Sequence, residues 1–540
     1  MTQSHRADPS PSPAPQGDPA ALAGLRQDLA DADYTVQQLG EIVGPVAIAA
    51  LDREQALPAL DAARASTAPA AALMRLLSLG EQVTRRELDR ALPRSGTAGA
   101  IRLGLVAAAG SGPDDGVRAL VDLRPVDVGP GGLWLASDLG EVATNQAVHP
   151  EHVLGLGAAG RTLAELTVRS PVARVLDVGT GCGIQALQIA SFAEQLVGTD
   201  ISSRALDYAA FNAGLNEVAL DLRRGDMLAP VAGERFDLIV SNPPFVITPR
   251  ADSGGAPDGS GSQVPGGASS SAPLQRFTYR DGGRSGDRLL ADLVGQIGAH
   301  LNPGGVAQLL ANWEIPRGGH WSEHVRDWLA GTGLDAWVIQ REATDPAHYA
   351  ETWLRDGGIT PERNPAHWQQ AYRAYLADFA ARDTEAIGFG YLILRRGSDQ
   401  DAPWRRFEEL TARLPPAPHH AIAHTLAAQQ YLAGADQMLP GERLLAERLV
   451  VAGDVTEERH YRPGQPDPEV VLLHQGGQLG RSVRVGSNTA AAVGACDGEL
   501  TLEQITTAVG VLTDAEPVQV RAEVLPVLAD LFLDGFLTIA

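Results

Sequence analysis

The fold is decided by Val175-Leu176-Asp177-Val178-Gly179-Thr180-Gly181-Cys182-Gly183, which is followed by a helical pattern over residues 184–190. An apolar strand, a glycine-rich turn and a helix thus come in direct succession. A second apolar strand, residues 196–199, ends on Asp200, and a third element ends at Gly225-Asp226. A fourth strand, residues 236–241, leads into Asn242-Pro243-Pro244-Phe245. This alternation predicts a parallel α/β sheet with a ligand crevice at the carboxyl ends of its strands.

The glycine turn indicates a nucleoside-bearing cofactor. Three glycines in five residues allow positive φ angles and a close approach of a ligand to the backbone. The dinucleotide fingerprint would need glycine at position 184, where this chain has isoleucine, and this weakens the case for a pyrophosphate site. Asp200 ends the second strand and is placed to accept hydrogen bonds from two ribose hydroxyls, which either class of cofactor would use.

The tetrad at residues 242–245 predicts a seat for a planar amine or amide. Its two prolines fix φ and remove two amide donors, so the carbonyl of Pro243 has no helix or ladder to join. The Asn242 side chain and this carbonyl can both accept hydrogen bonds from an NH2 group. Phe245 offers a ring face on which a planar group can stack.

In combination, the run VLDVGTGCG, the GTD at the second strand and the NPPF tetrad resemble the class I S-adenosylmethionine-dependent methyltransferases, over roughly residues 145–320. The tetrad resembles the amino-methylating group, which includes release-factor glutamine N5-methyltransferases, ribosomal RNA N-methyltransferases and adenine-N6 DNA enzymes. The resemblance implies a Rossmann-like α/β fold with a seven-stranded sheet, and S-adenosylmethionine as the cofactor.

The resemblance also implies roles for individual residues. The methionine part of the cofactor would lie at the glycine loop, the ribose at Asp200, and the adenine amino group near Asp226. Asn242 and Pro243 would hold the target nitrogen, within a catalytic set of Asn242, Pro243, Pro244 and Phe245. The implied cofactor-binding set is Asp177, Gly179, Thr180, Gly181, Gly183, Asp200, Ile201, Asp226, Met227 and Asn242.

The composition limits the number of domains and the classes of function that the chain can have. A chain of 540 residues is expected to form two to four domains. Its formal charge is -23 and it has no lysine, which excludes a lysine nucleophile or Schiff base. The acidic balance argues against a protein that coats nucleic acid, although a local basic groove remains compatible with it. Two cysteines exclude a disulfide framework or a zinc ribbon.

We expect four segments along the chain. Residues 1–18, rich in Pro, Ser and Ala, predict a disordered tail. Residues 19–144 predict a helical, winged-helix-like domain with a Thr84 cap and a hairpin made by residues 119–123 and 133–135. Residues 145–397 form the predicted methyltransferase domain, with a flexible insertion at 249–273. Residues 398–540 predict a second winged-helix-like domain. No signal peptide or membrane span is apparent, so we expect a soluble cytoplasmic protein.

Three further features have two interpretations each. The loop at 282–286 has nearby Arg280, Arg284 and Arg288; it is either an anion-friendly loop or a solvated turn, and it is similar to the Gly-Gly stretch of the glutamine methyltransferases. His149 and His152 could bind a metal, but a helix start explains them better, so no metal is predicted. Six of the eight tryptophans lie between residues 313 and 368; one of them could contact a substrate, but core or interdomain packing is the commoner role.

The favoured function is methylation of an exocyclic nitrogen on a base of ribosomal or transfer RNA. A close competitor is methylation of a glutamine side chain on a protein partner, such as a release factor or ribosomal protein. A small-molecule acceptor is third, because the flanking domains are typical of proteins that contact macromolecules. A protein that binds S-adenosylmethionine without catalysis is the alternative from another class. The oligomeric state stays open.

Overall fold

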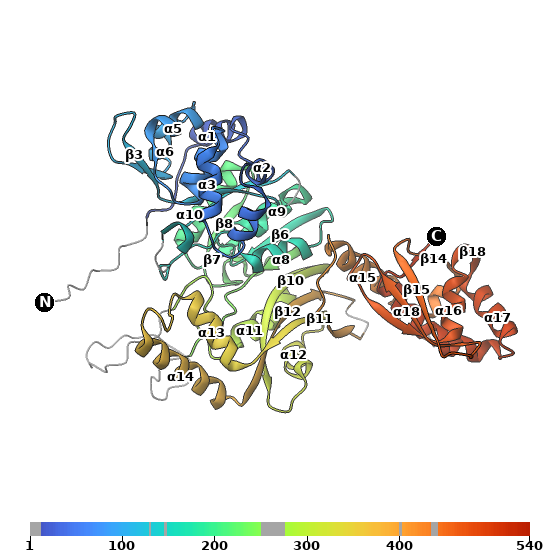
Figure 1. The fold of residues 1–540 in the computed structure, drawn as a ribbon. Coiled ribbons are helices and arrows are strands. Elements are labelled where there is room, and N and C mark those ends of the chain that lie inside the picture. The colour runs from blue at the N-terminus through green and yellow to red at the C-terminus, as the bar shows by residue number, and fades with distance from the viewer. Residues whose placement is uncertain (1–11, 129–130, 145–147, 250–275, 399–401, 434–440) are drawn as a thin grey trace. The chain divides into compact units, whose positions relative to one another are not determined.

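The computed structural model describes residues 12–128, 131–144, 148–249, 276–398, 402–433 and 441–540 (Figure 1). The chain divides into two compact units. The first comprises residues 1–164, 171–397 and 403–410, and the second comprises residues 165–170, 398–402 and 411–540. The N-terminal domain predicted at residues 19–144 and most of the methyltransferase domain predicted at 145–397 therefore lie in the same unit. None of the described helices is both long enough and apolar enough to span a bilayer.

The first unit is built on an eight-stranded sheet in the order β13-β11-β12-β10-β9-β6-β7-β8. Only β12 runs antiparallel to both of its neighbours; the other paired strands are parallel. The bounds are β6 (Val172–Val178), β7 (Ala193–Asp200), β8 (Asp221–Arg224), β9 (Phe236–Ser241), β10 (Leu301–Pro316), β11 (Asp335–Thr344), β12 (Thr384–Arg395) and β13 (Arg405–Glu409).

The sheet corrects the expected number of seven strands. The eighth strand, β13, extends the edge beyond β11 and comes from residues that the sequence predicted to belong to the C-terminal domain. Its sequence, Arg-Arg-Phe-Glu-Glu, has four charged residues and lacks the apolar alternation that marks a strand. Residues 302–305 form a register shift inside β10, where Gly304 has a φ of 77°.

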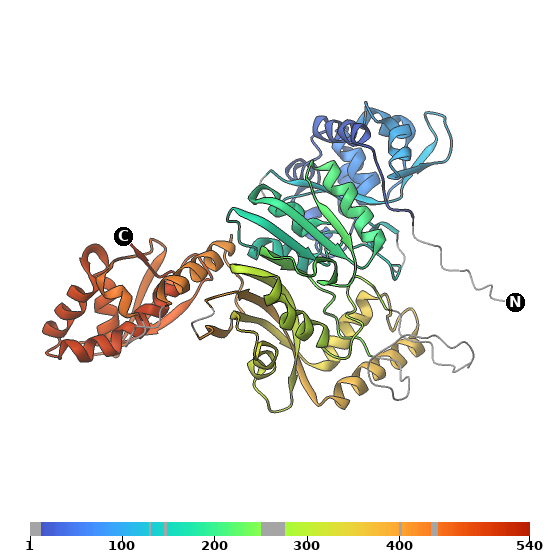
Figure 2. The ribbon, with the colours of Figure 1, turned by 180° about the vertical axis from the view of Figure 1, so that it is seen from behind.

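Helices cover both faces of the sheet (Figures 1 and 2). Right-handed crossovers place α9 (Ile184–Ile189) and α10 (Ser203–Leu215) on one face, and α11 (Arg288–Ile297) on the other. α12 (Trp321–Leu329) packs with α11 in a core that includes Leu293, Ile297 and Val325. Between β11 and β12, α13 (Pro346–Asp356) and α14 (Pro365–Ala381) form a helical pair with its own aromatic core. α7 (Glu141–Thr144) and α8 (Ala158–Leu166) precede β6.

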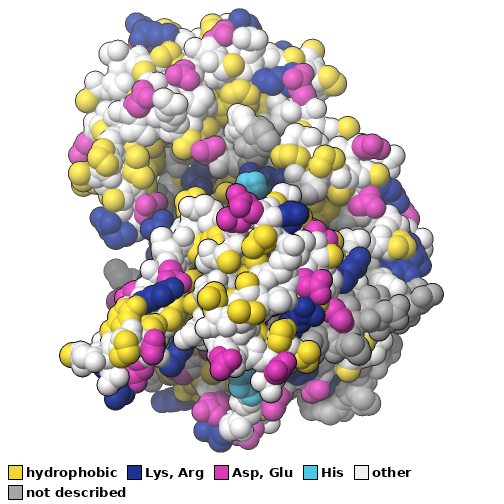
Figure 3. All heavy atoms as spheres, turned by 90° about the vertical axis from the view of Figure 1, so that its right-hand side faces the viewer, with side chains coloured by type: hydrophobic (Ala, Val, Ile, Leu, Met, Phe, Trp, Pro, Cys, Tyr) yellow, Lys and Arg dark blue, Asp and Glu magenta, His cyan; other side chains and the backbone are white. Residues whose placement is uncertain are grey.

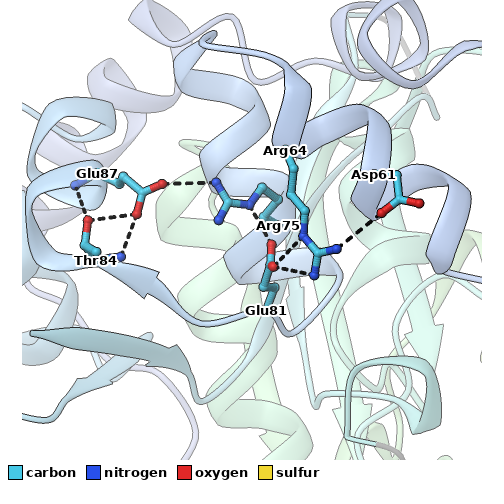
Figure 4. Close-up of polar contacts among 6 residues, drawn as sticks. All are labelled: Asp61, Arg64, Arg75, Glu81, Thr84 and Glu87. Atoms are coloured by element: carbon cyan, nitrogen blue, oxygen red, sulfur yellow. Dashed lines mark hydrogen bonds and ion pairs between the residues drawn. The ribbon is translucent and has the colours of Figure 1, made fainter.

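The N-terminal part of the first unit contains the element order of a winged helix. A helix, a short strand, two helices and two strands follow one another, and the strands lie in the order β1-β3-β2. Thr84 caps α5 in a reciprocal capping box with Glu87, which also pairs with Arg75 (Figure 4). The bounds are α1 (Pro19–Asp31), α2 (Val36–Leu51), α3 (Leu57–Ala65), α4 (Pro69–Leu73), η1 (Met74–Ser78), β1 (Val83–Thr84), α5 (Arg85–Ala91), α6 (Gly96–Arg102), β2 (Val106–Ala108) and β3 (Gly116–Ala119).

Two N-terminal predictions need revision. The wing is formed by β2 and β3, whereas the expected hairpin is a separate pair, β4 (Asp122–Val126) and β5 (Leu133–Ser137), which packs against α10. Residues 12–18 of the expected disordered tail have a defined place, since Gln16 N donates to Leu103 O and Asp18 caps α1. Residues 1–11 and almost all of the expected insertion at 249–273 lie outside the described residues.

The second unit contains two small sheets, ordered β18-β14-β19 and β15-β16-β17. The first sheet packs with α16, α17 and α18 in the order of a winged helix whose middle strand, β14, comes from upstream in the chain. Thr501 and Gln504 form a capping box at α17, as Thr84 and Glu87 do at α5. The bounds are α15 (His419–Leu432), η5 (Glu442–Ala446), β14 (Arg448–Val451), β15 (Val455–Tyr461), β16 (Pro468–Gln475), β17 (Ser482–Val485), α16 (Ser487–Gly494), β18 (Asp497–Thr501), α17 (Leu502–Leu512), α18 (Pro517–Leu533) and β19 (Leu537–Ile539).

Candidate active site

The carboxyl ends of β6, β7, β8 and β9 lie side by side at one edge of the sheet. Val178 is opposite both Thr199 and Ser241, and Asp200 is opposite Arg224. The four segments that follow these strands therefore meet at this edge. This brings together the candidate residues at 177–183, 200–201, 226–227 and 242–245, which lie in four separate stretches of sequence.

The loop between β6 and α9 turns through three glycines in the left-handed region. Gly179, Gly181 and Gly183 have φ angles of 70°, 55° and 88°. No described atom lies within 4 Å of the position that a Cβ would take on Gly179 or Gly181, so a ligand can approach the backbone there. A Cβ on Gly183 would stand 3.3 Å from the Cβ of Ala209, so this glycine allows α10 to pack closely against the loop.

Asp177 lies at the base of the glycine loop and is fully buried. Its Oδ2 accepts hydrogen bonds from Thr180 Oγ1 at 2.7 Å and from Ala186 N at 3.1 Å. Its Oδ1 is buried and has no hydrogen-bond partner among the described residues. Burial raises the pKa of the Asp177 carboxyl to about 7. A carboxyl group with an unpaired oxygen and a pKa near neutrality is suited to bind a cationic group.

Asp200 connects the end of β7 to the glycine loop. Its Oδ2 accepts a hydrogen bond from Gly181 N at 2.9 Å, and its Oδ1 accepts one from Ser202 N at 2.8 Å. Burial raises the pKa of this carboxyl above its ordinary value. The next residue, Ile201, is 58% exposed and puts an apolar side chain beside the acid. A hydrogen-bond acceptor next to an apolar surface suits a nucleoside.

The segment after β8 holds Met227 in the left-handed region, with a φ of 46°. Its carbonyl accepts a hydrogen bond from Thr199 Oγ1 at 2.9 Å, which fixes this strained turn to β7. The Asp226 side chain beside it is 62% exposed. A cavity of about 230 Å³ opens at this turn and is lined by residues that include Asp226, Met227, Leu228, Arg284 and His300. The cavity shares only Asp226 and Met227 with the predicted site, and its lining includes neither the glycine loop nor Asn242.

The tetrad follows β9 directly. Asn242 Oδ1 is buried and has no hydrogen-bond partner among the described residues. Such an oxygen is costly to leave unpaired, so it is set to receive a donor. The ring of Phe245 lies at right angles to the rings of Trp353 and Phe389, with centroids 6.4 Å from each. Phe245 thus belongs to an aromatic group to which the α13–α14 pair contributes Trp353.

The Gly-Gly turn at 282–283 lies against the tetrad. A Cβ on Gly282 would stand 2.8 Å from Pro244 O, a distance that only glycine permits. Val246 and Asp281 form a parallel bridge, in which Val246 N donates to Arg280 O at 2.8 Å. These contacts join the segment after the tetrad to the turn. The arginines nearby are paired with carboxylates, Arg280 with Asp356 and Arg284 with Asp292, which favours an ordinary turn over an anion-binding loop.

The histidines and tryptophans take mostly structural places. His152 is buried beside Tyr279, and burial lowers its pKa. No group of side chains suited to a metal ion occurs in the described part of the chain. Among the tryptophans, Trp353 contacts the tetrad. The others lie elsewhere: Trp313, Trp321, Trp328 and Trp337 are buried, and Trp368 stacks on Tyr372.

Comparison with known proteins gives two family matches. Residues 141–253 match the family described as methyltransferase small domain, and residues 31–120 match a domain of unknown function, DUF7059. The sheet order and the loop geometry agree with the first match. The chain contains a class I S-adenosylmethionine-dependent methyltransferase domain. The class predicted from the sequence is thereby confirmed.

Several curated relatives match parts of the methyltransferase domain. The release factor glutamine methyltransferase of Xylella fastidiosa is 53% identical over 78 residues, covering 14% of this chain and 28% of that protein. The corresponding enzyme of Koribacter versatilis is 34% identical over 167 residues, covering 30% and 54%. The ribosomal protein uL3 glutamine methyltransferase of Bradyrhizobium diazoefficiens is 44% identical over 101 residues, covering 18% and 30%. The chain thus matches between about a quarter and about a half of the length of these relatives.

The methyltransferase domain has the features that S-adenosylmethionine requires. The open side of Gly179 and Gly181 accommodates a ligand against the backbone, and the orphaned Oδ1 of Asp177 can meet a cationic amine. Asp200 offers hydrogen-bond acceptors beside the exposed apolar side chain of Ile201, a combination that suits a nucleoside. Sequence analysis did not single out Trp353 among the six tryptophans of its segment, and it did not find Asn212, whose Nδ2 donates to Cys182 O in the glycine loop at 2.9 Å.

Proposed function

We propose that this protein transfers the methyl group of S-adenosylmethionine to the side-chain amide nitrogen of a glutamine in a protein of the translation machinery. The observation that carries the proposal is the close approach of Gly282 to Pro244 O, in which the Gly-Gly turn lies against the tetrad at residues 242–245. The names of the matched relatives, which are glutamine methyltransferases of release factors and of a ribosomal protein, support this choice. It reverses the order that the sequence alone favoured, in which an RNA base came first.

In this proposal, the tetrad orients the amide nitrogen of the substrate. An amide nitrogen is conjugated and weakly nucleophilic, so the chain must hold its lone pair about 3 to 3.5 Å from the carbon it attacks. Asn242 Oδ1 and Pro243 O would accept hydrogen bonds from the two N–H groups of the amide. The two prolines stiffen this turn, so the two acceptors would stabilise the positive charge that develops on nitrogen at little cost of reorganisation.

The bound cofactor supplies a methyl group activated by a sulfonium. The chain holds it at one edge of the sheet through Asp177, the glycine loop and Asp200, as the geometry of these residues supports. Asn242 is not a base, so the proton lost from nitrogen passes to water.

An RNA base is the second candidate, favoured by the winged-helix element order of the N-terminal part. The charge of this N-terminal part supports RNA binding less well. Arg64, Arg86 and Arg94 each pair with a carboxylate. On the face that Figure 3 shows, basic and acidic side chains are interspersed. A strongly positive surface of the kind that binds RNA is therefore not evident on that face.

The test is methyl transfer from labelled S-adenosylmethionine into a lysate of cells that lack this gene. Wild-type protein and Asn242→Ala are compared, and the labelled product is treated with protease or ribonuclease. Label released by protease and recovered as N5-methylglutamine after enzymatic digestion supports the proposal. Label lost to ribonuclease would replace it with the RNA function. Absence of Asn242-dependent label in every fraction, while the protein still binds S-adenosylmethionine, would leave a binding protein without catalysis.

A further inference from the structure

A stripe of side chains on α10 docks the β4–β5 hairpin onto the methyltransferase domain. Four residues spaced by four along the helix, called here the docking stripe, are Arg204, Tyr208, Asn212 and Asn216, the last at the C-cap. Their partners run along β5 and just past its end: Arg204 and Tyr208 bond to Asp138, Asn212 to Ala136, and Asn216 to Trp134.

The spacing of the two elements explains this match. Four residues of helix advance about 6 Å, and two residues of strand advance about 6.7 Å, so every fourth helical residue meets every second strand residue. β5 pairs with β4 on its other edge, where Trp134 is opposite Pro125, a residue with no N–H to donate. The main-chain groups of Trp134 and Ala136 therefore point away from β4 and toward α10.

The side-chain amide of each asparagine makes the pair of main-chain hydrogen bonds that a neighbouring strand would otherwise make to β5. Ala136 N donates to Asn212 Oδ1 at 2.7 Å, and Asn212 Nδ2 donates to Ala136 O at 2.9 Å. Trp134 N donates to Asn216 Oδ1 at 3.0 Å, and Asn216 Nδ2 donates to Trp134 O at 2.8 Å. The two asparagines thus make the same pair of bonds to β5.

Asn212 makes one further bond, and this bond reaches the cofactor site. Its Nδ2 also donates to Cys182 O at 2.9 Å, in the glycine loop. Asn212 is fully buried. The peptide between Cys182 and Gly183 is held at both ends, because Gly183 N donates to Thr180 O at 2.8 Å. This peptide leads into Gly183, the N-cap residue of α9, and it lies one residue beyond Gly181, whose N–H bonds to Asp200.

We infer that Asn212 is a positioning residue for the cofactor, which fixes the glycine loop against β5 and thereby makes the N-terminal hairpin part of the S-adenosylmethionine site. The bond to Cys182 O sets the plane of a peptide whose neighbours, Gly181 and Gly183, have no Cβ to restrict their φ angles. Without this bond the loop would sample other conformations, and cofactor affinity would fall. The inference depends on the cofactor site and is independent of the identity of the acceptor.

The experiment compares Asn212→Ala with Asn216→Ala in the full chain. Both variants lose the same two bonds to β5, but only the first loses the bond to the glycine loop. The dissociation constant for S-adenosylmethionine is measured by titration calorimetry, and the midpoint of thermal unfolding is measured for each variant. We expect both midpoints to fall, and we expect the dissociation constant to rise at least tenfold in Asn212→Ala and less than threefold in Asn216→Ala. Equal affinities in the two variants would overturn the inference.

A second measurement uses the wild-type protein, and so does not depend on the stability of a variant. If the glycine loop and β5 are coupled through Asn212, S-adenosylmethionine should slow hydrogen exchange of the amides in residues 133–137, although none of them belongs to the glycine loop. The amides of β3, residues 116–119, serve as the control and should not change. Unchanged exchange in β5 at saturating cofactor would also overturn the inference.

Discussion

The amide of Gly181 donates a hydrogen bond to Oδ2 of Asp200 at 2.9 Å, so the acid that ends β7 also holds the glycine loop that follows β6. The same carboxylate accepts from Ser202 N through its other oxygen. Asp200 therefore shapes the loop in addition to facing the position proposed for the ribose, and its removal should affect both.

Replacement of Asp200 should weaken cofactor binding strongly. In Asp200→Ala both backbone donors lose a charged partner, and a hydrogen bond to a charged group contributes roughly 1.5–3 kcal/mol. We expect the dissociation constant for S-adenosylmethionine to rise at least tenfold in titration calorimetry. Asp221→Ala, an exposed acid on β8 paired with Arg223, is the control and should bind normally. An unchanged affinity in Asp200→Ala would contradict the assignment of this edge.

Cofactor affinity should rise with pH through neutrality. Burial raises the pKa of Asp177 to about 7, so the free protein holds this carboxyl protonated below that pH. A cationic methionine group favours the ionised form, and binding near pH 6.5 should therefore release a proton. Calorimetry in two buffers of different ionisation enthalpy measures that proton. Asp177→Asn should remove the pH dependence, and a flat wild-type profile between pH 6 and 8 would argue against the contact.

The Asp177 carboxyl also predicts how the stability of the fold changes with pH. Its pKa is above the ordinary value of 3.8 in the folded state, so the folded protein binds more protons than the unfolded chain between about pH 4 and 7. The free energy of unfolding contributed by Asp177 therefore falls as pH rises through this window. Denaturant unfolding at pH 5 and pH 7.5 should show a smaller decrease for Asp177→Asn than for the wild type. A decrease of equal size would assign the trend to other groups.

A methyl group on Gly282 should disturb transfer without disturbing cofactor binding. Its Cβ would come within 2.8 Å of Pro244 O, so either the turn or the tetrad must move. Overpacking of this kind costs typically 1–3 kcal/mol and displaces neighbours. Gly295→Ala is the matched control, because it lies within α11 where no described atom is within 4 Å of the new carbon. We expect labelled methyl transfer to drop at least tenfold in Gly282→Ala alone, with the dissociation constant for S-adenosylmethionine unchanged.

The two capping boxes should contribute similarly in the two units. Thr84→Ala removes an acceptor for the Glu87 amide, and Thr501→Ala does the same for Gln504. Each change should lower stability by about 1 kcal/mol. Domain-resolved hydrogen exchange would assign the loss, in the first unit for Thr84→Ala and in the second for Thr501→Ala. A loss that spreads over both units would show that they unfold together.

Sequence alone located the strand ends that carry the cofactor loop, because glycine runs, a terminal acid and a proline pair each have a local physical meaning. It could not find β13, where the charged sequence Arg-Arg-Phe-Glu-Glu pairs with a strand 69 residues earlier in the chain, Arg405 being opposite Ala336. It assigned the wing to the wrong hairpin, since β2 and β3 are only three and four residues long. The role of Asn212 could not be predicted for a third reason. Its partners come from two distant segments, and no local sequence pattern indicates such contacts.

The docking stripe has a consequence for dividing the protein into fragments. The two matched families end at residue 120 and begin at residue 141, so the β4–β5 hairpin belongs to neither. A fragment that starts at residue 141 would remove the β5 partners of Asn212 and Asn216, so the glycine loop would keep its bond to Asn212 but lose its link to β5. Any minimal version of the methyltransferase domain, or any chimera that exchanges the N-terminal part, should therefore be cut ahead of Asp122, so that the hairpin travels with α10.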